Sequence, residues 1–158
     1  MSAELIKRIT FRLRKVEVLT GDALEAQDAL QALVPAANVR QGNLDTSVGF
    51  PQVTFRQSGG TPNRLSHEQI GVIGQPEFDF EVWTDDRRGD TASNILDLIE
   101  QLLDDRRGVV NPLTGAAGYK QFAMHILTDA AVFFDSITNR WFGLQRYQAI
   151  EGRWKQGT

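Results

Sequence analysis

The sequence predicts an α+β fold: a single domain with a mixed or antiparallel sheet of about four to five strands and helices packed on one face. Three observations indicate this. An amphipathic strand leads through a polar turn into an amphipathic helix between Phe78 and Leu103, extended segments follow from Phe122 to Ile150, and an amphipathic helix pattern begins the chain. Because an apolar helix stripe must be buried against another layer, the helices are expected to pack on the sheet.

The composition is that of an ordinary domain without cysteine chemistry. With 41% hydrophobic and 23% charged residues, the 158-residue chain can bury one core, so we expect one domain over residues 1–154 and a frayed tail over residues 155–158. The absence of cysteine excludes disulfides and thiolate ligands. A formal charge of −3 disfavours a dedicated nucleic-acid binder. The sequence contains no run of about 18 apolar residues, so no membrane span is predicted.

The strand, turn and helix in the middle of the chain form the clearest local pattern. Apolar and acidic side chains alternate over residues 77–82, which predicts one core face and one acidic face. A polar turn over residues 84–89 follows, Asp90 or Thr91 is expected to cap the helix, and residues 106–108 supply a cationic last turn and a glycine stop. The apolar helix positions recur at i, i+3, i+4 and i+7: Ile95, Leu98, Ile99, Leu102 and Leu103.

The remaining elements are predicted from shorter patterns. A helix is expected over residues 4–18, and a second, short helix ends before Pro35. A half-buried strand opens at Pro51, because apolar and polar residues alternate after it. The chain closes with three extended segments, over residues 122–126, 131–134 and 141–150, which suggest an antiparallel meander.

Residues 57–76 are a candidate contact segment. They carry repeated glycine and proline, so they form either a long loop or a pair of irregular extended arms. Long loops in compact domains are usually functional. Arg64 and His67, which lie in this segment, are therefore candidate interface residues.

The histidines and glycines do not form a recognisable catalytic or metal-binding motif. His67 begins His-Glu-Gln-Ile-Gly but lacks the second histidine of a zinc protease motif, and His125 is expected to be an ordinary half-buried strand residue. The glycine-bearing pieces lack the spacing and the lysine of nucleotide-binding loops. We therefore predict no metal and no cofactor.

The acidic row Glu77, Asp79 and Glu81 is the one arrangement that could support catalysis. Strand residues at i and i+2 stand roughly 6.5–7 Å apart, near the separation of paired carboxylate catalysts. Acid and base roles, however, require carboxylates in different environments, and a regular row gives them similar ones. A solvated or pore-lining face is therefore the favoured interpretation, and no catalytic residue is predicted.

Basic and aromatic residues provide the other candidate interface positions. The arginine pairs adjoin aspartate pairs, so solvated helix ends are the alternative interpretation. The aromatic residues could be either core lids or interface anchors. The candidates are Arg87, Arg88, Arg106, Arg107, Trp141 and Tyr147.

The order of these elements resembles the tail-terminator, or tail-completion, proteins of long-tailed bacteriophages. The resemblance rests on the helical residues 5–18, the proline-opened strand 50–55, the strand and helix in 78–103, and the closing strands 122–150. It covers most of the chain but has no invariant motif. The stretch 21–34 and the length of segment 57–76 depart from the family pattern.

The resemblance implies a non-enzymatic virion protein that assembles in the host cytoplasm. Such a protein forms a ring, usually a hexamer, that caps the head-proximal end of the tail tube and stops its polymerisation. Its partners are copies of itself, the tail-tube protein and a neck or head-completion protein. Glu77, Asp79 and Glu81 would face the lumen, where DNA passes without specific binding.

Two alternatives stay open at the level of the sequence. A head-closure or neck adaptor is similar in size and also forms rings, so periodicity does not separate it from a terminator. A small α+β enzyme or ligand-binding module that uses the acidic row is the second alternative.

Overall fold

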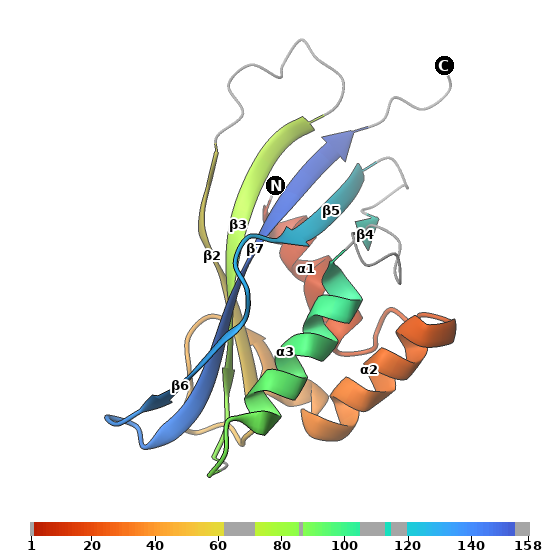
Figure 1. The fold of residues 1–158 in the computed structure, drawn as a ribbon. Helices are drawn as coiled ribbons and strands as arrows, with labels where there is room; N and C mark the ends of the chain where they lie inside the picture. Colours follow the sequence, from red (N-terminus) through yellow and green to blue (C-terminus); the bar gives the residue numbers. More distant parts are fainter. Residues whose placement is uncertain (1, 62–71, 86, 105–112, 115–119, 154–158) are drawn as a thin grey trace.

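The computed structural model describes residues 2–61, 72–85, 87–104, 113–114 and 120–153 (Figure 1). These residues form a seven-stranded sheet in the order β1-β2-β3-β7-β5-β4, and β6 also pairs with β7. The helices are α1 (Ser2–Leu13), α2 (Gly21–Leu33) and α3 (Asp90–Leu103). The strands are β1 (Val39–Gln41), β2 (Gln52–Thr61), β3 (Val72–Trp83), β4 (Leu113–Thr114), β5 (Lys120–Ile126), β6 (Ala131–Asp135) and β7 (Arg140–Arg153).

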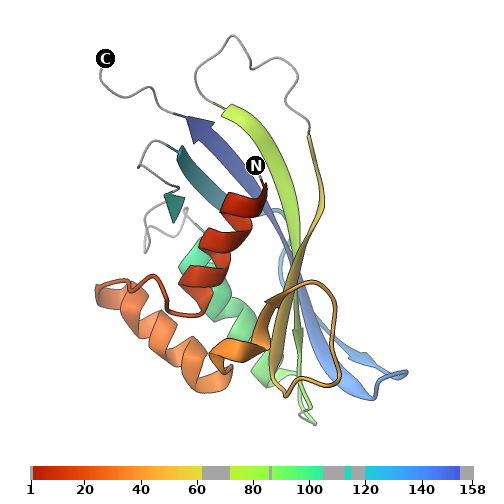
Figure 2. The ribbon, with the colours of Figure 1, turned by 180° about the vertical axis from the view of Figure 1, so that it is seen from behind.

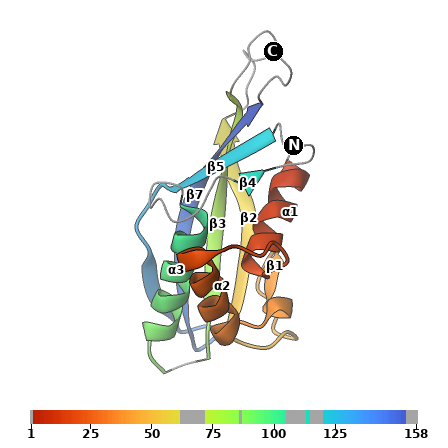
Figure 3. The same ribbon diagram turned by 90° about the vertical axis from the view of Figure 1, so that its right-hand side faces the viewer.

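The predicted α+β class is confirmed, with a larger sheet than expected. The three helices cover one face of the sheet, and Figure 3 shows them in front of it. The sheet is mixed because β1 runs parallel to β2, while the other strand pairs are antiparallel. The extra strands include β1 and β4, which have three and two residues and are too short to show an apolar period.

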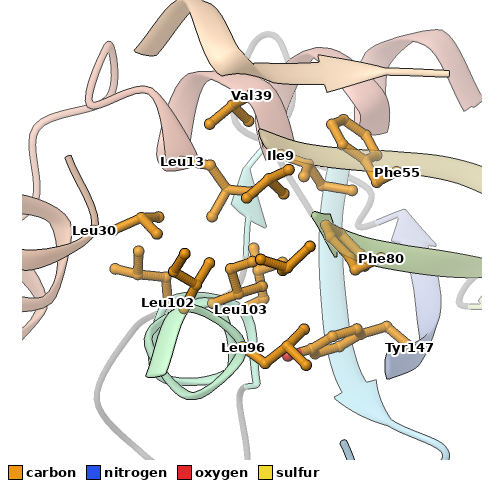
Figure 4. Packing of buried hydrophobic residues seen from close by; sticks show 14 of the residues in the cluster. Ile9, Leu13, Leu30, Val39, Phe55, Phe80, Leu96, Leu102, Leu103 and Tyr147 are labelled. Carbon is orange, nitrogen blue, oxygen red and sulfur yellow. The ribbon is translucent and has the colours of Figure 1, made fainter. Parts of the chain in front are cut away.

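The central strand and helix form the core, with two differences from the predicted helix stripe: Leu98 is only half-buried, and the fully buried Leu96 is an addition. Phe78, Phe80 and Val82 of β3 are fully buried, and α3 packs its buried apolar residues on this side of the sheet. Phe80 stacks on Phe55 with ring centroids 5.2 Å apart and meets the edge of Tyr147 at 5.1 Å (Figure 4). Each fully buried side chain of this size contributes roughly 1.5–3 kcal/mol of transfer free energy.

Helix α3 begins and ends differently from the prediction. Neither Asp90 nor Thr91 is its N-cap: that position is Gly89, which makes no side-chain cap bond and whose carbonyl accepts the Ser93 N–H. The helix ends at Leu103, and the Asp104 N–H donates to the Glu100 carbonyl. The predicted stop at residues 106–108 lies outside the described residues.

Helix α1 ends at Leu13, five residues before the predicted boundary at Val18. Lys15 adopts a φ of 61°, a left-handed conformation that terminates helices. Gln27 then fixes the connection to α2, because its side-chain amide donates to the carbonyls of Arg12 and Glu17. The apolar residues beyond the break, Val16 and Val18, consequently lie exposed rather than in the core.

Of the two predictions for residues 57–76, a long loop or a pair of extended arms, the described parts confirm the extended arms. Strand β2 continues to Thr61 and β3 already begins at Val72, with the pairing shifted between Gln57 and Gly59. On the lower part of β2, the segment between β1 and β2 folds back on the side of the sheet away from the helices (Figure 2). Gln52 holds it there, donating to the Asp45 carbonyl and accepting from the Asp45 N–H.

The predicted antiparallel meander of the last three strands is wrong. Strands β5 and β6 do not pair with each other; both pair with the same edge of β7, at residues 147–153 and 140–144 respectively. Strand β7 is 14 residues long, so one edge has room for both partners. Sequence alternation identifies strands but contains no information on which strand is the neighbour.

Candidate assembly surface

The face of the sheet away from the helices carries the predicted acidic row. Because side chains alternate along a strand, Glu77, Asp79 and Glu81 of β3 lie opposite the buried Phe78, Phe80 and Val82. The register places Arg146 of β7 beside Asp79 and Arg56 of β2 beside the same residue on the other side. The acidic row is therefore flanked by cations on both neighbouring strands.

Asp79 is paired with Arg146. The Arg146 Nε donates to Asp79 Oδ1 at 2.8 Å, and the side chains are 46% and 12% exposed respectively. This hydrogen bond, followed by the charge of Asp79, raises the pKa of Arg146, and Glu77 adds to the effect. Arg146 consequently stays cationic and offsets one of the three carboxylates.

Glu81 is held by two donors. Arg56 Nη2 lies 3.3 Å from Glu81 Oε1, and the Trp83 indole N–H donates to Glu81 Oε2 at 3.1 Å. Arg56 also donates to Asn43 in the segment before β2, which keeps the guanidinium over the sheet. Three carboxylates and two arginines give this row a formal charge of −1 instead of −3.

The Arg146 pair can be tested by substitution. Because Asp79 is largely buried, Arg146→Met should lower the free energy of unfolding by about 1 kcal/mol, a value reduced by the exposure of Arg146. Urea unfolding would measure it. The matched control is Arg88→Met, since Arg88 lies 3.9 Å from Asp90 with both side chains more than three-quarters exposed (83% and 78%), and its loss should change little. Equal effects of the two substitutions would contradict a structural role for the Arg146 pair.

An aromatic cluster lies beside the acidic row on the same face. Trp83 stacks on Phe142 with centroids 4.6 Å apart, and Phe142 contacts Phe133 at 5.3 Å. The cluster crosses β3, β7 and β6, which are hydrogen-bonded neighbours. Phe133 is 45% exposed, so the cluster reaches solvent at the β6 side of the sheet.

The hairpin that joins β6 to β7 is held by Asp135. Its carboxylate accepts from the Thr138 hydroxyl at 2.7 Å and from the Ile137 N–H at 3.1 Å, and these bonds lower its pKa. Because the pKa is lowered in the folded protein, these bonds stabilise the hairpin at neutral pH. The stabilisation is lost as the pH falls below 3.8, the ordinary pKa of aspartate, and through the lower pKa of the folded protein.

We therefore expect the Ile137 amide to exchange faster with solvent as the pH falls into this range, after correction for the intrinsic rate. Hydrogen exchange followed by NMR would show it. In Asp135→Asn, which cannot titrate, the corrected exchange rate should be independent of pH. A pH dependence of the same size in that variant would contradict the assignment to Asp135.

Trp141 ties the start of β7 to the turn before α3. Its indole N–H donates to the Arg87 carbonyl at 3.0 Å, and its ring meets Phe134 edge-on at 5.5 Å. A Cβ on Gly89 would come within 2.8 Å of Val132 and 3.2 Å of Trp141, so this turn packs closely against the β6–β7 hairpin. Arg87 and Arg88 are exposed next to it.

Tyr147 is a core residue, which corrects its selection as an interface candidate. It is fully buried, its ring contacts Phe80, and its hydroxyl donates to Gln145 Oε1 at 3.1 Å. The polar hydroxyl therefore finds its partner inside the domain. Ala149, two residues further along β7, is buried on the same face, and the register places Tyr147 opposite Ile126 of β5.

Four other interface candidates, Arg64, His67, Arg106 and Arg107, lie outside the described residues, as does the predicted tail. His125 is half-buried on β5, and its Nε2 lies 3.2 Å from Gln148 Oε1. Within the part of the chain that the structure describes, no group of three or more acidic or histidine side chains could hold a metal ion. No helix there is long and apolar enough to cross a membrane.

Sequence reasoning missed the cationic partners of the acidic row and the aromatic cluster. The alternation along its strand already placed Arg56 on the face opposite Val53 and Phe55. Its proximity to Glu81, and that of Arg146 to Asp79, depend on strand order and register across segments that are 25 and 67 residues apart.

Comparison with known proteins decides the family. The model of the family described as "Tail completion protein gp17" matches residues 21–151, most of the chain. The chain belongs to this tail completion protein family. The match includes the stretch 21–34, which departs from the expected pattern and forms α2.

The fold of this tail completion protein also occurs in a solved particle. A chain from the structure titled "Virion of native gene transfer agent (GTA) particle" aligns with a TM-score of 0.63 at 15% identity, covering 96% of this chain and 97% of the other. At this identity the likeness is one of fold. A search of curated proteins finds no match.

Proposed function

We propose that this tail completion protein forms a ring that caps the head-proximal end of a phage tail tube, stops its polymerisation and joins the tail to the neck. The match of the family over residues 21–151 carries the proposal. The similar fold of the virion chain agrees with a structural role in a particle. The chain would then be a virion component with no catalytic activity, and the tube and neck proteins would be its partners.

The sheet face away from the helices suits a wall around passing DNA, outside the part of β2 that the segment between β1 and β2 covers. Its row of Glu77, Asp79 and Glu81 is neutralised to a formal charge of −1 by two arginines, so it offers DNA no cationic grip and only weak repulsion. We propose this face as the lumen lining. The carboxylates serve as the fixed partners of Arg56 and Arg146, which makes the lining rigid.

Partner choice tests the role. The protein should sediment with preformed tail tubes of its phage and saturate at a small, fixed amount per tube, since only tube ends are available. Binding to the portal-side connector but not to tubes would indicate a neck adaptor instead. Binding along the whole tube would contradict an end cap.

The acidic row separates assembly from enzymatic chemistry. The triple variant Glu77→Gln, Asp79→Asn, Glu81→Gln should still bind tube ends, because the tube contact is not assigned to this face. Circular dichroism must show it folded, since the change removes the carboxylate partners of Arg56 and Arg146 and gives the row a formal charge of +2. A hydrolytic activity that is present in the natural protein and abolished in this variant would support an enzyme instead.

A further inference from the structure

Strand β6 presents an unprotected edge. In the described part of the chain it pairs only with β7, and its sequence Ala-Val-Phe-Phe-Asp contains no proline, lysine or glycine and has its one charge, Asp135, at the last residue. Phe133 and Phe134 point to opposite faces and are 45% and 50% exposed. Edge strands normally carry charges, prolines or bulges that prevent pairing with another chain, so an edge of this kind favours an added strand.

The backbone of β6 has groups directed toward this edge. The Trp141 carbonyl accepts from the Thr84 N–H, so Trp141 turns its peptide groups toward β3. Phe134, which lies opposite Trp141, is therefore in a non-hydrogen-bonded pair with β7 and directs its N–H and carbonyl away from β7. By the same alternation, Val132 does so too. Aromatic surface and outward main-chain groups together fit an extended strand better than a flat apolar partner.

We propose that the β6 edge pairs with a second copy of this chain and continues the sheet from one subunit to the next. This inference rests on the proposed ring. A closed ring repeats one heterologous contact, so the surface that receives β6 must be a different surface of the same chain. The opposite edge of the sheet provides it, because beyond β1 the described part of β2 pairs with β3 alone.

The strand directions agree with such a pair. Strand β6 is antiparallel to β7, β7 to β3, and β3 to β2, so β6 and β2 run in opposite directions. A neighbouring copy in the same orientation would therefore add an antiparallel pair to the sheet. The Phe55 carbonyl accepts from the Gly42 N–H on the β1 side, so by alternation Gln57 directs its peptide groups toward this edge.

One register satisfies backbone, face and charge together. With Phe134 opposite Gln57, both residues direct their peptide groups into the new pair, and both side chains lie on the helix-covered side of the sheet. Asp135 then lies opposite Arg56 on the uncovered face. Arg56 is 43% exposed while paired with Glu81, so its guanidinium can also meet the carboxylate of the neighbouring copy.

The cysteine-free sequence makes this register directly testable. A variant carrying Phe134→Cys and Gln57→Cys, treated with a short bifunctional maleimide with and without the tail-tube protein, should give a ladder of covalent multimers. The control variant pairs Phe134→Cys with Gln31→Cys, since Gln31 is an exposed residue of α2. Equal ladders in the two variants, or no ladder in the first while rings form, would overturn the proposal.

Substitutions that block the β6 edge test the same contact without a cross-linking reagent. Phe134→Pro removes an N–H that does not serve the β7 pair, so the fold should persist, and Phe134→Lys is the second variant in case proline disturbs the strand. Both should need roughly tenfold more protein to form rings, as expected for loss of a central interface side chain. Circular dichroism and thermal unfolding confirm that each variant is folded.

The control is Ile137→Ser at the 92% exposed hairpin tip, which removes apolar surface but leaves the edge intact. An equal loss of rings in this variant would assign the contact to the tip and overturn the edge proposal. If the natural protein caps tubes and both folded Phe134 variants do so equally well, the edge proposal fails and the proposed function stands. If the natural protein does not bind tubes, the proposed function fails, and cross-linking without the tube protein still decides the edge.

Discussion

Phe80→Ala should lower the free energy of unfolding by about 3–5 kcal/mol. Phe80 is fully buried in the middle of β3, stacked on Phe55 and in edge contact with Tyr147, so its loss removes two aromatic contacts as well as apolar burial. Strands β2 and β7 flank this position, and their rings cannot close the cavity without shifting the backbone. Urea unfolding followed by tryptophan fluorescence would measure the change.

The matched control is Phe133→Ala, the same substitution on the opposite face of the same sheet. Phe133 is the solvent-facing member of the aromatic cluster, in contact with Phe142 and 45% exposed, so this variant should lose about 1 kcal/mol or less. Comparable losses in the two variants would contradict the assignment of Phe80 to the core and Phe133 to the surface.

Gly143→Val should cost about 1–3 kcal/mol or more, because α3 lies directly on this glycine. A Cβ at Gly143 would come within 2.5 Å of Leu96 Cδ1 and 3.6 Å of the Ala92 Cβ. Leu96 is fully buried and has little room to move. The absence of a side chain at Gly143 therefore allows α3 to approach β7 closely. Thermal unfolding would measure the loss of stability in the variant.

A double-mutant cycle separates this steric contact from a general loss of glycine. Gly143→Ala and Leu96→Ala should each destabilise, the first by overpacking and the second by a cavity of about 2–5 kcal/mol. Combined, they should cost clearly less than the sum, since the added methyl enters the space that the leucine leaves. Strict additivity would show that the two side chains do not share that space.

Much of the fold could be predicted from the sequence because its strongest periods coincide with full burial. The alternation of residues 77–82 marks the buried face of β3, and the helical spacing of residues 95–103 marks most of the buried face of α3, although it includes the half-buried Leu98 and omits the fully buried Leu96. Helix α1 was predicted too long because Val16 and Val18 continue its apolar character past a left-handed Lys15. An amphipathic period does not show where a single backbone dihedral ends the helix.

The candidate surface was only half predictable. The acidic residues were visible in the sequence, but their charge is balanced by Arg56 and Arg146, which depend on strand neighbours remote in sequence. Tyr147 has the aromatic ring and polar tip of an interface anchor, yet the register turns it into the core beside Gln145. Residue type alone does not decide between these two locations.

In the proposed ring, the sheet face away from the helices and the β6 edge would have different tasks. The row that includes Asp79 and Glu81 is internally paired, which suits a wall that contacts DNA without holding it. The β6 edge has exposed Phe133 and Phe134, which suits contact between protein subunits. A ring built this way would join its subunits through the edges of the sheet. The helices would lie on the sheet face opposite the acidic row (Figure 1).

Electron microscopy of the protein mixed with its tail-tube subunit would show whether the protein caps one end of the tail tube. We expect rings seated at one end of the tubes, and tubes that stop growing once they are capped. Tubes that grow without limit and carry no bound protein would contradict it.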